Sequence, residues 1–177
     1  RTGRAAFVSN YGEGTFTVLP VLKDGKLGAP TDSVRFSGNG PNAQRQNKPH
    51  AHSATISPDN RFAYVCDLGT DRIYIFAIDP AKGKVKPAAT PYVTVMPGAG
   101  PRHFTFSPDG RFAYVVEELT STVAVFAQDA KTGFLAKHHD GVATLPADFK
   151  GQNTSADIHT DPSGKHLYQS NRGHNAL

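Results

Sequence analysis

Short apolar runs separated by polar turns form the main pattern of this chain. The runs at 62–66 (FAYVC) and 112–116 (FAYVV) are aromatic and β-branched, which is typical of strands buried on both faces. A turn with the sequence Ser-Pro-Asp precedes each run, and a polar link follows it. No stretch has the spacing of an amphipathic helix, so the pattern predicts an all-β chain. The further expected strands lie at 72–78 and 122–128, and near 92–96 and 142–145.

The pattern is an internal repeat. SPDNRFAYV at 57–65 recurs as SPDGRFAYV at 107–115, and partial copies occupy 3–21 and 156–177. Units of roughly 50 residues with four short strands are typical of β-propeller blades. A β-sandwich also uses many short strands, but it gives no reason for an internal copy. We therefore predict a single β-propeller domain over 1–177, with units at roughly 1–50, 51–100, 101–154 and 155–177.

The number of units predicts an incomplete ring. The 177 residues hold about 3.5 units, whereas propellers close with about 4 to 8 blades. We therefore expect the remainder of the propeller chain to be a partner of this segment. An isolated half ring would expose the apolar faces of its end blades and is expected to aggregate.

The copies differ where a propeller would place a site. In an up-and-down blade, the start of the first strand and the end of the second strand lie at the same mouth of the ring. The chain has His52 and Arg102 at the first position and Glu118 and Arg172 at the second. Arginines hold phosphates or carboxylates, and a carboxylate with an imidazole can act as base and acid. The structural alternative is an ion pair of Glu118 with either arginine at the rim.

A long polar loop at 37–52 precedes the second unit. Loops of this length are either disordered or functional. Arg45 and His50 in this loop are candidate substrate-binding residues. His50 and His52 form an H-x-H pair that could ligate zinc, but no third ligand is evident, so we expect no metal and no other cofactor.

Other polar residues near the rim are weaker candidates. Tyr11 ends a second strand and His159 lies on a first strand, so both are expected to contact substrate. His103 follows Arg102 and is expected to be a hydrogen-bonded histidine inside the blade. Cys66 lies in an apolar run and is expected to be a buried, inert thiol.

Charge and composition narrow the function classes. The net charge is +4, and the basic residues are scattered without a run, which argues against nucleic-acid binding. No stretch approaches eighteen apolar residues, so no membrane span is expected. We expect a cytoplasmic protein. Because the chain does not begin with Met, a periplasmic or secreted protein is the alternative.

Four segments carry a family resemblance. NYGEGTFTVLPV, HAHSATISPDNRFAYVCDLGTDRIYIF, GAGPRHFTFSPDGRFAYVVEEL and ADIHTDPSGKHLYQSNRGHN closely resemble the lactonase family of seven-bladed propellers, in the right order. That family includes 6-phosphogluconolactonases and muconate lactonizing enzymes. The resemblance implies seven blades and a site made of a His, an Arg, a Glu and a second Arg. These fall on His52, Arg102, Glu118 and Arg172. The EEL motif departs from the family's usual NEL, so Glu117 is a competing carboxylate.

The resemblance implies an enzyme of carbohydrate metabolism. The first expectation is hydrolysis of 6-phosphogluconolactone, a reaction of the pentose phosphate pathway, on a small anionic lactone. Glu118 would activate water, His52 would protonate the leaving oxygen, and Arg102 and Arg172 would bind the anion and stabilise the oxyanion. The alternatives are a 3-carboxymuconate cyclase that uses the same groups and a propeller that only binds a partner.

Overall fold

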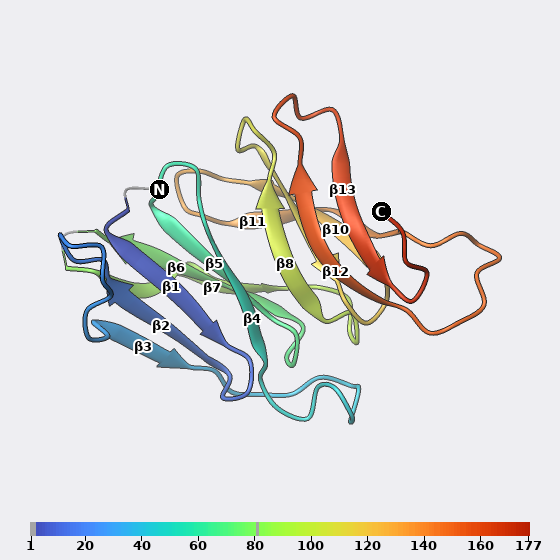
Figure 1. Cartoon of the computed structure of the whole chain (residues 1–177), viewed down its shortest axis with the longest axis horizontal. Coiled ribbons are helices and arrows are strands. Elements are labelled where there is room, and N and C mark those ends of the chain that lie inside the picture. The colour runs from blue at the N-terminus through green and yellow to red at the C-terminus, as the bar shows by residue number, and fades with distance from the viewer. Residues whose placement is uncertain (1–2, 81) are drawn as a thin grey trace.

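In the computed structural model of the chain, residues 3–80 and 82–177 are described, and all regular structure in them is strand. No helix in these residues is long and apolar enough to cross a membrane. Figure 1 shows the sheets arranged side by side, with the first sheet of the chain at one end and the last sheet at the other. The strands are β1 (Ala5–Asn10), β2 (Thr15–Pro20), β3 (Asp32–Arg35), β4 (Ala51–Ile56), β5 (Phe62–Asp67), β6 (Arg72–Asp79), β7 (Lys84–Thr94), β8 (Pro101–Phe106), β9 (Phe112–Glu117), β10 (Thr122–Gln128), β11 (Leu135–Ala143), β12 (Thr154–Thr160) and β13 (Leu167–Arg172).

The sheets have the topology of propeller blades. Two are complete antiparallel four-stranded meanders, in the orders β4-β5-β6-β7 and β8-β9-β10-β11. Sheets of three strands (β1 to β3) and two strands (β12 and β13) flank them. The inner strands β4, β8 and β12 contact one another in sequence order. The arrangement confirms the all-β propeller prediction.

The outer strand of each complete sheet is longer than the sequence suggested. β7 begins at Lys84, eight residues before the expected start, and contains Pro87 and Pro91. The missing N–H of a proline is tolerated on an edge strand, because one side of that strand has no ladder to complete. Because prolines and polar residues are not typical of strands, the sequence pattern did not indicate the first part of β7.

The repeated Ser-Pro-Asp turn fixes the link between the first two strands of a unit. Asn60 adopts a φ of 62° and donates its N–H to the Ser57 carbonyl at 3.0 Å. The Ser57 hydroxyl accepts the N–H groups of Arg61 and Phe62 and donates to Asp59. Asn is among the few side chains that tolerate a positive φ, which explains why Asn or Gly occupies this position.

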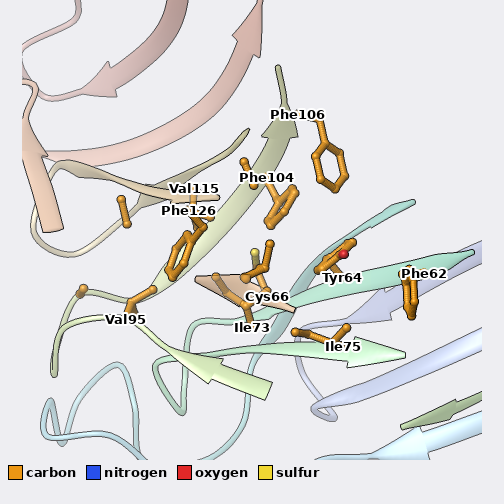
Figure 2. Packing of buried hydrophobic residues seen from close by; sticks show 14 residues of the cluster. Phe62, Tyr64, Cys66, Ile73, Ile75, Val95, Phe104, Phe106, Val115 and Phe126 are labelled. Atoms are coloured by element: carbon orange, nitrogen blue, oxygen red, sulfur yellow. The ribbon is translucent and has the colours of Figure 1, made fainter. Parts of the chain in front are cut away.

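The main core lies between the second and third sheets, as Figure 2 shows. Tyr64 is fully buried and stacks on Phe104 with a centroid distance of 5.1 Å. Its hydroxyl donates to the carbonyl of Gly133 on the next blade at 2.9 Å. Cys66 is buried in the same cluster, and burial raises the pKa of its thiol to about 12, which agrees with an inert role.

The contact between the first and second sheets contains a cavity. Phe62 fills the space over Gly133, but the residue at the matching position of the first unit is Ala5. A cavity of about 380 Å³ lies there, lined in part by Ala5, Phe7 and Ile78. This cavity does not include the rim residues that the repeat singled out.

Each inner strand carries a β-bulge at the rim. In β4 the pairing shifts between Ala51 and Ser53, so His52 is the extra residue. In β8 it shifts between Pro101 and His103, so Arg102 is the extra residue. A bulge leaves its extra residue out of the ladder and re-aims the side chain, and bulges are common next to active sites. Two of the four divergent residues of the repeat, His52 and Arg102, are therefore turned out of the pleat by the backbone.

Candidate functional site

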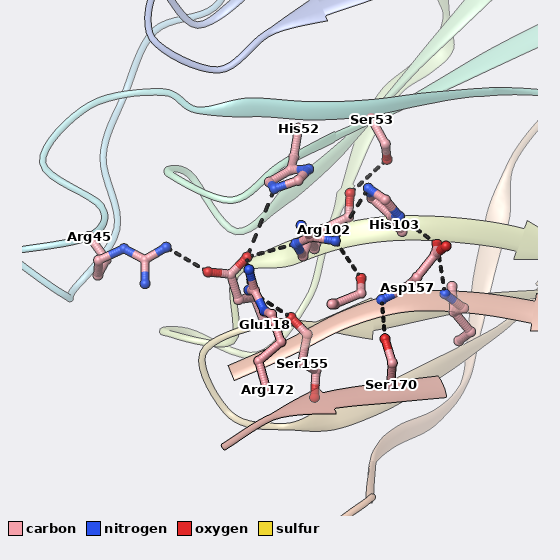
Figure 3. A network of polar contacts seen from close by, with 12 residues as sticks. Arg45, His52, Ser53, Arg102, His103, Glu118, Ser155, Asp157, Ser170 and Arg172 are labelled. Atoms are coloured by element: carbon pink, nitrogen blue, oxygen red, sulfur yellow. Dashed lines mark hydrogen bonds and ion pairs between the residues drawn. The ribbon is translucent and has the colours of Figure 1, made fainter. Parts of the chain in front are cut away.

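Glu118 is the centre of a polar cluster at the rim (Figure 3). Its side chain is 5% exposed and lies directly after β9. Arg45 contacts its Oε1 at 2.6 Å, and Arg102 Nε contacts its Oε2 at 2.9 Å. Arg172 contacts the same Oε2 at 3.2 Å, and His52 Nε2 lies 3.9 Å from it. The structure thus brings together the four residues that the repeat indicated and adds Arg45.

The charges of the cluster determine the state of Glu118. Burial alone raises the pKa of this carboxyl, but the hydrogen bond from Arg45 and the charges of Arg172 and Arg102 outweigh burial. The pKa therefore lies below its usual range, and Glu118 is ionised at neutral pH. Three guanidinium groups surround one carboxylate, so the cluster keeps two positive charges in excess. Such a cluster attracts an anion.

Arg102 is held on two sides by groups of different blades. Its Nε donates to Glu118, and its Nη1 donates to the carbonyl of Ala156 in β12 at 2.7 Å. Among the described residues, no hydrogen bond engages its Nη2. The guanidinium is therefore fixed in direction and keeps one N–H pair for a ligand.

His52 is neutral at neutral pH. Its side chain is 18% exposed, and burial together with the nearby charge of Arg102 lowers its pKa to about 4. The rings of Tyr11 and His103 contact it edge to face, at centroid distances of 5.5 and 5.2 Å. A neutral imidazole can accept a proton, whereas it is poorly suited to donate one.

The polar loop is anchored over the rim. Gln46 is fully buried and donates to the Leu68 carbonyl at 2.8 Å and to Asp71 at 2.7 Å. The neighbouring Arg45 reaches Glu118 across 73 positions of sequence. The sequence left open whether the loop is disordered or functional. The structure shows that buried hydrogen bonds hold it over the rim with Arg45 at the cluster.

A substitution at Gly69 is expected to displace this loop. A Cβ at Gly69 would overlap the carbonyl oxygen of Lys48, which is backbone and cannot rotate away. We expect Gly69→Ala to lower the free energy of unfolding by about 1–3 kcal/mol, as overpacking does. Thermal unfolding measures this loss. Gly12→Ala is the matched control, because it stands at the same position of the first unit and a Cβ there meets no atom within 4 Å.

The other sequence candidates lie around the cluster. Tyr11 is 37% exposed and stacks on His50 at a centroid distance of 4.3 Å. The Nδ1 of His50 also contacts the Tyr11 carbonyl at 3.0 Å. His159 contacts Asp157 at 2.9 Å and does not contact Glu118. Tyr11 and His50 thus form a wall beside His52, while His159 lies further along β12.

His103 is not the core histidine that the sequence suggested. It is half-buried, and its Nδ1 contacts Asp157 of the next blade at 2.7 Å. The bulge at Arg102 is the physical reason, because it shifts the alternation of β8 by one residue. Sequence reasoning did not identify Asp157. The sequence did contain a signal for Asp157, since the repeat offsets align Ser53, His103 and Asp157 at one position.

The competing carboxylate Glu117 is structural. It ends β9, is 1% exposed, and accepts a hydrogen bond from Thr122. Burial raises its pKa, and no residue in the described part of the chain bonds its Oε1. The same part of the chain contains no group of three His, Cys, Asp or Glu side chains arranged to hold a metal ion.

Comparison with known proteins places this architecture in a family. The model of the family described as "Lactonase, 7-bladed beta-propeller" matches residues 1–177. A 6-phosphogluconolactonase of Bacillus subtilis is 33% identical over 169 residues, which cover 96% of this chain and 47% of that protein. The chain therefore spans about half the length of the curated relatives it matches.

Solved structures agree with the family match. A protein from Lactobacillus plantarum superposes with a TM-score of 0.91 at 36% identity, over 99% of this chain and 49% of that one. The periplasmic gluconolactonase of Pseudomonas aeruginosa superposes with a TM-score of 0.86 at 35% identity, over 96% of this chain and 47% of that one. With blade topology and sequence in agreement, the chain belongs to the seven-bladed β-propeller lactonase family.

Proposed function

We propose that the protein containing this chain hydrolyses the lactone of a phosphorylated sugar acid, with 6-phosphogluconolactone as the first candidate. The observation that carries the proposal is the excess of two positive charges around Glu118, beside a neutral imidazole. The name of the Bacillus subtilis relative supports the same substrate class.

The arginines suit the two anionic parts of the reaction. Arg45 and Arg172 are 38% and 49% exposed, so they can reach a phosphate or carboxylate of an entering substrate. Arg102 is more buried and fixed in direction, which suits the oxyanion that forms when water adds to the lactone carbonyl. We therefore assign substrate binding to the first two and oxyanion stabilisation to Arg102.

The state of the titratable groups supports roles for Glu118 and His52 that differ from those suggested by the sequence. Both oxygens of Glu118 accept hydrogen bonds from arginines, so this carboxylate is poorly placed to accept a proton from water. His52 is neutral and half-buried at the same place. We assign His52 as the group that takes the proton as the water oxygen attacks. Glu118 then holds the arginines in place.

In this scheme His52 takes up the proton in the first step of the reaction and releases it in the second. The water oxygen bonds to the carbonyl carbon and its proton goes to His52. The tetrahedral intermediate then expels the ring oxygen, which takes the proton from the His52 imidazolium and becomes a hydroxyl group. The products are a hydroxy acid and the regenerated imidazole.

A substrate panel tests the proposal. We expect the intact protein to hydrolyse 6-phosphogluconolactone above the spontaneous rate and to prefer it over unphosphorylated gluconolactone by roughly 10- to 100-fold in kcat/KM. Arg172→Ala is expected to reduce this preference. Turnover of 3-carboxymuconate in place of the lactone would show a cyclase. Turnover of neither would leave a binding propeller.

A further inference from the structure

A link between two inner strands lies beside the proposed site and takes no part in the roles assigned above. Asp157 of β12 accepts from Nδ1 of His103 of β8 at 2.7 Å. Nε2 of His103 lies 3.4 Å from Nη1 of Arg102. Figure 3 shows Asp157, His103 and Arg102 in a row that leads to Glu118. The row connects an exposed carboxylate to the guanidinium assigned to the oxyanion.

The proton on His103 has a defined position. Burial raises the pKa of Asp157, but hydrogen bonds with His103 and His159 outweigh burial and lower it to about 2. Asp157 is therefore ionised and can only accept hydrogen bonds. The Nδ1 of His103 must then carry a proton, and in a neutral ring its Nε2 presents a lone pair. That lone pair faces an N–H of Arg102, which can only donate.

The surroundings of His103 favour this arrangement over others. The charged and titratable groups that face it are Arg102 of its own strand, His52 of β4 and Asp157 of β12. Arg102 is itself bound by Glu118 through Nε and by the Ala156 carbonyl through Nη1. The Nε2 lone pair of His103 gives Nη1 of Arg102 a second acceptor, which further fixes the direction of the guanidinium. The two N–H groups of Nη2 then point away from Glu118, Ala156 and His103.

We propose that Asp157 and His103 are positioning residues, which hold Arg102 in the direction needed to meet the oxyanion. The inference rests on the proposed lactone hydrolysis for its catalytic meaning. In this proposal the carboxylate of Asp157 selects the tautomer of His103, and that tautomer orients the guanidinium of Arg102. His103 and Asp157 touch no reacting atom in this scheme and act through Arg102.

A purely structural role is the competing explanation. The same position of the repeat also joins the second and third sheets, where Ser53 donates to the carbonyl of Arg102 at 2.6 Å. Asp157 and His103 could join the third and fourth sheets in the same manner. The substitution Asp157→Asn distinguishes the positioning role from the structural role. An amide can donate a hydrogen bond to Nδ1 of His103 and so stabilise the opposite tautomer of that ring. Nε2–H would then face the donor of Arg102.

The test uses the intact protein with Asp157→Asn, Asp157→Glu and Asp161→Asn. Asp161 is the matched control, since it follows the same strand and contacts His166 at 3.1 Å at the other end of β12. We expect Asp157→Asn to lower kcat roughly 10- to 100-fold with KM nearly unchanged, because the lost orientation matters only for the oxyanion. Asp157→Glu should restore much of kcat, and Asp161→Asn should leave it unchanged.

Nitrogen-15 NMR of the histidine rings and of the arginine Nε–H groups gives a readout that does not need turnover. We expect Asp157→Asn to move the His103 proton from Nδ1 to Nε2 and to shift the Arg102 Nε–H signal. An unchanged tautomer, an unchanged Arg102 signal, or a kcat that follows only the folded fraction would overturn the inference. Absence of lactone hydrolysis by the wild type would remove the proposed function. The NMR result would still decide whether Asp157 orients Arg102.

Discussion

Glu118→Gln is expected to lower the free energy of unfolding by about 2–3 kcal/mol at pH 7. The variant keeps the shape of the side chain but leaves Arg102, Arg45 and Arg172 without their counter-charge. Removing one partner of a buried ion pair typically costs about 3–5 kcal/mol. The loss should lie near or below the low end of that range, because Arg45 and Arg172 are 38% and 49% exposed and water solvates them. Urea unfolding of the intact protein measures the difference.

Glu117→Gln is the matched control, since the two carboxyls are neighbours and both are buried. The pKa of Glu117 is raised by burial, so ionisation of this group opposes folding, and its amide variant should be neutral or slightly stabilising. The pKa of Glu118 is lowered, so its contribution is present above the ordinary glutamate pKa and is lost as the pH falls through the lower folded value. Equal losses for both variants at pH 7 would contradict the charge argument.

His52→Gln is expected to reduce kcat/KM for the lactone by about 10²–10⁴-fold, the range for loss of a general base. In the wild type, kcat/KM reports the free enzyme, in which His52 must be neutral to accept a proton. Burial and the charge of Arg102 lower its pKa from 6.5 to about 4. We therefore expect the acid limb of kcat/KM to have its midpoint near pH 4, measured against the spontaneous reaction at each pH.

The variant provides the check on that assignment. If His52 is the base, the limb near pH 4 should be absent from the residual activity of His52→Gln. His139→Gln, an exposed histidine on the outer strand β11, should behave like the wild type. A wild-type midpoint near 6.5 would show that a less perturbed group takes the proton.

The blade architecture could be predicted from the sequence because the chain contains two near copies of the same unit. The copied turn and the buried run after it, such as 62–66, are fixed by local φ preferences and by burial on both faces, and these leave clear signals in composition. The outer strand β7 was only partly predicted, since an edge strand is half exposed and accepts proline and lysine. Packing determines the inner strands, while pairing on one side is enough for the outer ones.

The residues of the candidate site could be predicted only where they differ between copies of the repeat. His52 and Glu118 were found because they break a copied pattern. The contact of Arg45 with Glu118 depends on the path of a loop, which Gln46 fixes through buried hydrogen bonds that no periodicity reveals. The misplacement of His103 has a different cause, because a one-residue bulge reverses which side of the strand it occupies.

The bulges also bear on how such a site can change over evolutionary time. Because His52 and Arg102 stand outside the pairing ladder, replacing their side chains leaves the strand pairing within each blade intact. The chain shows this freedom in its own sequence, as the aligned position of the third inner strand is Ala156. Each inner strand thus offers one position at which a new side chain alters the proposed site and not the strand pairing. A ring built from such blades can acquire a different substrate by a few independent substitutions, each tolerated without repacking the core.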